Sequence, residues 1–92
     1  MCRNITELRG LEPPATREEV EAAARQYVRK VTGIAKPNLT LAAELDAAAL
    51  EIAEITERVL THLPPRRQPP PSLPPLRRPD VRERLGLAPF AG

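Results

Sequence analysis

Proline distribution is the feature that most constrains this chain of 92 residues. Nine of its twelve prolines lie between Pro64 and Pro89. Proline lacks a backbone N–H and breaks helices and central strands, so the last third cannot form the same structure as the rest. We therefore divide the chain into a candidate folded domain, residues 1–63, and a proline- and arginine-rich tail, residues 64–92. We expect this tail to be disordered or extended as polyproline II.

The residue types available for a core favour closely packed helices. Tyr27 and Phe90 are the only aromatic residues, so the core has to be built from Leu, Ile, Val and Ala. The single cysteine, Cys2, leaves no internal disulfide, and no apolar stretch approaches the ~20 residues of a membrane span. We expect a cytoplasmic protein that makes no contact with a membrane.

The first helix is expected between Thr16 and Gly33. Thr16 and Glu19 have the spacing of a capping box, in which each side chain bonds to the backbone of the other residue. Apolar residues then recur at helical spacing, and Gly33 suits the left-handed end of a helix. Arg29 and Lys30 fall in the last turn, where cations complement the helix dipole.

The second helix is expected to run to about Leu63. Pro37 interrupts the chain before it, and Asn38 or Thr40 can cap it. Its apolar residues are spaced alternately by four and three positions, which is the pattern of a heptad seam. They are Leu41, Leu45, Ala48, Ile52, Ile55 and Val59.

Together these segments predict an all-α fold, a helix-loop-helix hairpin. At ~1.5 Å per residue the two helices span roughly 24 and 35 Å, so the longer one has apolar surface that its partner cannot cover. We expect a homodimer that closes a four-helix bundle. The alternative is a monomer in which Ile5, Leu8 and Leu11 pack across the hairpin.

A short amphipathic element is expected at residues 80–90 of the tail. Asp80 and Glu83 have capping-box spacing, and Val81 and Leu85 share one helical face ahead of Phe90. This element can dock on a protein partner or back on the body. The simpler interpretation is a tail with residual helicity.

A basic patch is expected at the end of the first helix, next to Tyr27, and consists of Arg25, Arg29, Lys30 and Lys36. We count its first three residues with Val81, Leu85 and Phe90 as the candidate interaction residues. Residues 1–63 nevertheless carry a net charge of −2 against +4 in the tail. Nucleic-acid binding calls for more positive charge and for stacking aromatic residues. We do not expect a nucleic-acid partner.

Cys2 and His62 are the candidates for chemistry. If the initiator methionine is removed, Cys2 offers a free amine beside a thiol, which can chelate a metal or act as a nucleophile. One Cys and one His cannot form a closed metal site within one chain. We therefore expect no cofactor and an interaction module rather than an enzyme, with a metal- or thiol-dependent protein as the alternative.

The opening Met1-Cys2-Arg3-Asn4-Ile5 and the segment Tyr27-Val28-Arg29-Lys30 resemble an uncharacterised family of small bacterial proteins. The resemblance is clearest over about the first 40 residues. It implies relatives without an assigned activity. The sequence departs from the family pattern at Leu45, where phenylalanine is usual, and in the tail, where the family carries an alanine- and arginine-rich stretch.

Overall fold

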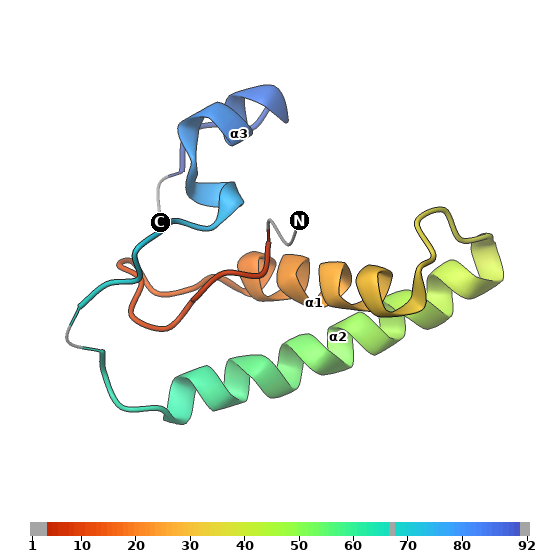
Figure 1. The fold of residues 1–92 in the computed structure, drawn as a ribbon, viewed down its shortest axis with the longest axis horizontal. Helices are drawn as coiled ribbons and strands as arrows, with labels where there is room; N and C mark the ends of the chain where they lie inside the picture. The colour runs from red at the N-terminus through yellow and green to blue at the C-terminus, as the bar shows by residue number, and fades with distance from the viewer. Residues whose placement is uncertain (1–3, 67, 91–92) are drawn as a thin grey trace.

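A helical hairpin forms the body of the protein, as a computed structural model that describes residues 4–66 and 68–90 shows. Its helices are α1 (Arg17–Thr32) and α2 (Leu39–His62), which run antiparallel along each other (Figure 1). A 3₁₀ helix, η1 (Pro75–Arg77), and a short helix, α3 (Pro79–Arg84), follow. Since the described residues form helices and loops without a strand, the prediction of an all-α hairpin is confirmed.

Both ends of α1 follow from local sequence. The Thr16 hydroxyl accepts a hydrogen bond from the Glu19 amide at 3.2 Å, and the Glu19 carboxylate accepts one from the Thr16 amide at 2.9 Å. This is the predicted capping box. At the other end Gly33 adopts φ +72°, a left-handed conformation that glycine enters without steric cost.

Helix α2 begins and ends close to the predicted residues. Asn38, rather than Thr40, is the N-cap, and its side chain accepts a hydrogen bond from the Leu41 amide at 2.9 Å. The helix ends at His62, and Leu63 is already extended. Pro64 follows directly, and a residue before proline is disfavoured in the helical region.

The core lies between the two helices and the segment that precedes them. Leu8 and Leu11 of this segment are buried together with residues of both helices. The small side chains of Ala49 and Ala53 are almost fully buried, which lets neighbouring chain come close to α2. The alternative in which the N-terminal segment packs on the hairpin is thus partly correct, although Ile5 remains 43% exposed.

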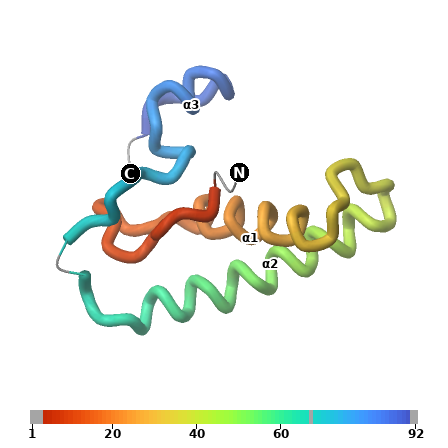
Figure 2. The backbone as a smooth tube through the Cα atoms, in the orientation of Figure 1, coloured from red at the N-terminus to blue at the C-terminus, as the bar shows by residue number. Residues whose placement is uncertain are grey.

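The expectation of a disordered tail is corrected by the structure. The chain returns from the end of α2 and places α3 on the side of α1 that faces away from α2 (Figure 2). Pro74, Pro75, Arg77 and Val81 are buried. The proline content indicated disorder. It carries no information about the ion pair that Arg77 forms with the buried Glu19 of α1.

Candidate interaction surface

The C-terminal segment is joined to α1 by a buried ion pair. Arg77 donates from Nε to Glu19 Oε2 at 2.7 Å and from Nη2 to Glu19 Oε1 at 3.0 Å. The two side chains are only 3% and 1% exposed. A third hydrogen bond runs from Arg77 Nη2 to the Pro14 carbonyl at 3.0 Å. A bidentate arginine–carboxylate pair of this kind fixes both position and orientation, so it holds η1 against the start of α1.

Phe90 covers the same arginine. Its ring centroid lies 4.5 Å from the Arg77 guanidinium carbon and 5.8 Å from that of Arg82, which is the geometry of a cation–π contact. Arg82 also donates to the carbonyl oxygens of Leu76 and Ala88. The end of the described chain therefore folds back over η1 and α3.

The three predicted interaction residues of the tail differ in how far they contact the rest of the chain. Val81 is buried and Phe90 lies on Arg77, whereas Leu85 is 57% exposed. Within this structure the element at residues 80–90 docks on its own chain. Leu85 alone of the three keeps most of its surface free.

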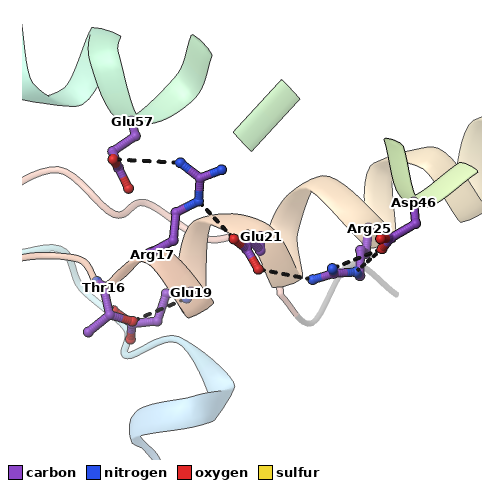
Figure 3. A network of polar contacts seen from close by, with 7 residues as sticks. All are labelled: Thr16, Arg17, Glu19, Glu21, Arg25, Asp46 and Glu57. Carbon is purple, nitrogen blue, oxygen red and sulfur yellow. Dashed lines mark hydrogen bonds and ion pairs between the residues drawn. The ribbon is translucent and has the colours of Figure 1, made fainter. Parts of the chain in front are cut away.

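A chain of ion pairs links α1 to one flank of α2 (Figure 3). Arg17 contacts Glu21 at 2.8 Å and Glu57 at 3.7 Å, and Arg25 contacts Glu21 at 3.4 Å and Asp46 at 2.9 Å. The hydrogen bond from Arg17 holds the pKa of Glu21 below its ordinary value. The hydrogen bond to Asp46 raises the pKa of Arg25.

The predicted basic patch is therefore split. Arg25 is engaged by carboxylates of both helices. Arg29 and Lys30 lie exposed beside Tyr27, which is itself 51% exposed. Lys36 is exposed as well, so three of the four predicted cations are available to a partner.

The opposite flank of α2 is apolar and open. We call the six residues of the heptad seam the α2 stripe: Leu41, Leu45, Ala48, Ile52, Ile55 and Val59. Leu45 and Ile52 pack against the core at its edge. Leu41, Ile55 and Val59 are 37%, 53% and 49% exposed. The heptad spacing predicted this apolar surface. It did not predict that some residues of the stripe pack against the core while others stay exposed.

Helix geometry explains why the hairpin leaves part of the stripe uncovered. Residues of an α-helix are about 100° apart around its axis, so Ile55 lies about half a turn around α2 from Asp46, nine residues earlier. Asp46 and Glu57 are the residues that contact α1 through ion pairs. The exposed part of the stripe, Leu41, Ile55 and Val59, therefore faces away from α1, whereas Leu45 and Ile52 lie at the edge of the core.

Of the two candidates for chemistry, the structure describes only His62. Cys2 lies outside the described residues, and His62 is exposed at the end of α2. In residues 4–66 and 68–90 no three His, Cys, Asp or Glu side chains lie close enough to hold a metal ion. The same part of the chain has no helix that is long and apolar enough to span a membrane.

The ion pair between Glu19 and Arg77 was not predicted from the sequence. Glu19 was assigned to the capping box and Arg77 to a flexible tail. The two residues are 58 positions apart, and nothing in the local pattern of either one indicates the other. One sequence feature could have indicated a contact here: the adjacent arginines Arg77 and Arg78 lie among prolines, directly before a possible helix start.

The fold and this surface define a small helical-hairpin protein with a docked C-terminal segment. The chain belongs to the family of uncharacterised conserved proteins DUF2277, whose model matches residues 1–84. No curated protein and no solved structure matches it. The family match extends well beyond the first 40 residues and includes η1 and α3. A family without a characterised member assigns no activity, so the function is unassigned.

Proposed function

We propose that this protein is a helical interaction module that works as a homodimer, in which the α2 stripes of two copies pack together and close a four-helix bundle. The observation that carries the proposal is the half-exposed row formed by Leu41, Ile55 and Val59. Large apolar side chains aligned along one helix flank are typical of helix-to-helix packing.

Burial of the stripe would supply a substantial driving force. Fully burying a Leu, Ile or Val side chain contributes roughly 1.5–3 kcal/mol. About half of that remains to be gained at Ile55 and Val59, and about a third at Leu41. A chain of this length buries a smaller fraction of its surface when it folds alone than a larger domain does. A second copy adds apolar burial without demanding a larger chain.

A cytoplasmic location fits this proposal. The chain has one cysteine in 92 residues, so its stability relies on packing and ion pairs rather than on an internal disulfide. An exposed apolar stripe is also a surface that association with a second copy would protect.

Sedimentation equilibrium of the full chain tests the proposal. We expect a species of twice the chain mass at micromolar concentrations. Ile55→Glu should yield the monomer, because a charge would be buried in the middle of the apolar contact. Helical content by circular dichroism should be retained, since Ile55 is half exposed and glutamate is a good helix former.

Ala43→Glu is the matched control. Ala43 is exposed on α2 and lies far around the helix from the stripe, so the same charge there should leave the dimer intact. A wild-type chain that stays monomeric up to millimolar concentration would overturn the proposal. So would a dimer that Ile55→Glu and Ala43→Glu weaken equally.

A further inference from the structure

The α2 stripe is self-complementary about its centre. Leu41 and Val59 lie nine residues on either side of Leu50, Leu45 and Ile55 lie five, and Ala48 and Ile52 lie two. In a two-fold dimer of antiparallel helices, residues equally far from the axis on opposite sides meet across the interface. An antiparallel pair centred at Leu50 therefore places every residue of the stripe opposite another member of the stripe.

Charged residues along one edge of the stripe distinguish the two possible directions. Glu44, Glu51 and Arg58 follow each other at intervals of seven, so they share one edge. In a parallel pair the two-fold axis runs along the helices, so this edge of one copy lies beside the uncharged edge formed by residues 42, 49 and 56 of the partner subunit, and none of the three charges gains an ion pair. In an antiparallel pair centred at Leu50, Glu44 lies two residues from the position opposite Arg58 of the partner subunit, within reach of its long side chain, and this contact occurs twice, while Glu51 lies close to its own copy.

The three edge residues are free to make these contacts. All three are exposed, and none of them forms an ion pair within residues 4–66 and 68–90. The exposed part of the stripe beside them, Leu41, Ile55 and Val59, also faces away from the ion pairs on the other flank. The edge is thus unoccupied by the chain itself.

The charge distribution along the hairpin supports the same direction. The stretch between Glu21 and Glu44 contains no Asp or Glu, and its cations are Arg25, Arg29, Lys30 and Lys36. The second half of α2 carries Glu51, Glu54 and Glu57 against Arg58. An antiparallel pair brings the basic stretch between Glu21 and Glu44 of one copy near the acidic second half of α2 of the other. A parallel pair brings segments of the same charge together.

We infer that two copies pair antiparallel through the α2 stripe about a two-fold axis near Leu50, with Glu44 of each copy forming an ion pair with Arg58 of the partner subunit. This inference rests on the proposed homodimer and adds its direction and register. The partner is a second copy of this chain, because the apolar residues of the stripe and the charges along its edge are each complementary to those of an antiparallel second copy.

Charge reversal at the edge tests the register. Glu44→Arg and Arg58→Glu each turn two attractive contacts into repulsive ones, and each should raise the dimer dissociation constant about tenfold at low salt. The double variant Glu44→Arg/Arg58→Glu restores opposite charges and should return to within about twofold of wild type. Glu83→Arg, at an exposed position of α3, controls for the change in net charge.

The outcomes separate the register from the proposed function. Dimers weakened by both single variants and restored by the double variant support the antiparallel register. A dimer that Ile55→Glu disrupts but neither single reversal weakens beyond the Glu83→Arg control overturns the register and leaves the homodimer standing. A chain that is monomeric overturns both.

Discussion

At the scale of single residues, Glu19 serves two structures with one carboxylate. Its Oε1 accepts from the Thr16 amide of the capping box and from Arg77 Nη2, and its Oε2 accepts from Arg77 Nε. The start of α1 and the C-terminal segment therefore share a single buried group. Any change that removes one partner leaves the other charge buried without compensation.

We expect Arg77→Met and Glu19→Gln each to lower the free energy of unfolding by roughly 3 kcal/mol, because breaking a buried pair from one side costs about 3–5 kcal/mol. The double variant should lose clearly less than the sum, since it leaves no unpaired charge. Urea unfolding followed by circular dichroism measures all three. Arg84→Met, on an exposed arginine of α3, should be nearly neutral. Additive losses would show that the pair is not coupled.

At the scale of elements, local sequence determined where the helices begin and end, and tertiary contacts determined the rest. Thr16, Gly33 and Asn38 act at short range, through hydrogen bonds to neighbouring backbone or a left-handed φ, so their roles were readable from the sequence. The heptad spacing located the apolar flank of α2 for the same reason. Which half of that flank faces the core depends on where α1 and Leu8 pack, and spacing alone does not contain that information.

Gly33→Ala should destabilise the protein by about 1 kcal/mol. Gly33 has φ +72°, and a left-handed conformation costs a residue with a Cβ atom roughly 1–2 kcal/mol. No other atom lies within 4 Å of the added Cβ, so backbone strain is the whole effect. Gly33→Asn should lose less, because asparagine tolerates this conformation better than alanine. Thermal unfolding of both variants measures the difference, and equal losses would contradict this explanation.

Glu21 should make the stability of the hairpin depend on pH. Its hydrogen bond with Arg17 holds its pKa below the ordinary value of 4.5. A lowered carboxylate pKa gives stability that is present above the unfolded value and is lost as the pH falls through the folded value. Glu21→Gln should thus be less stable than wild type at pH 7, and the difference should shrink below pH 4.5. Melting temperatures between pH 7 and pH 3 measure it, and a constant difference would contradict it.

At the scale of the whole molecule, the C-terminal segment completes the domain instead of trailing from it. Arg66 extends this attachment, with its guanidinium 3.2 Å from Glu7. Composition predicted a spacer because prolines prevent regular structure, and that inference about secondary structure was largely sound. It failed for tertiary structure, since a proline-rich segment loses less conformational freedom when specific contacts fix it.

Phe90 should couple the end of the described chain to the start of α1, although no secondary structure links them. Replacing it with alanine removes the ring above Arg77 and opens the Glu19–Arg77 pair to water. We expect Phe90→Ala to speed hydrogen exchange of the amides in η1, α3 and the first turn of α1, while those in the middle of α2 stay protected. Hydrogen exchange followed by mass spectrometry resolves these segments. Leu85→Ala removes a similar amount of apolar surface from an exposed position and should leave the first turn of α1 unchanged. Exchange that rises only within η1 and α3 would mean that the ring stabilises its own segment and does not couple it to the hairpin.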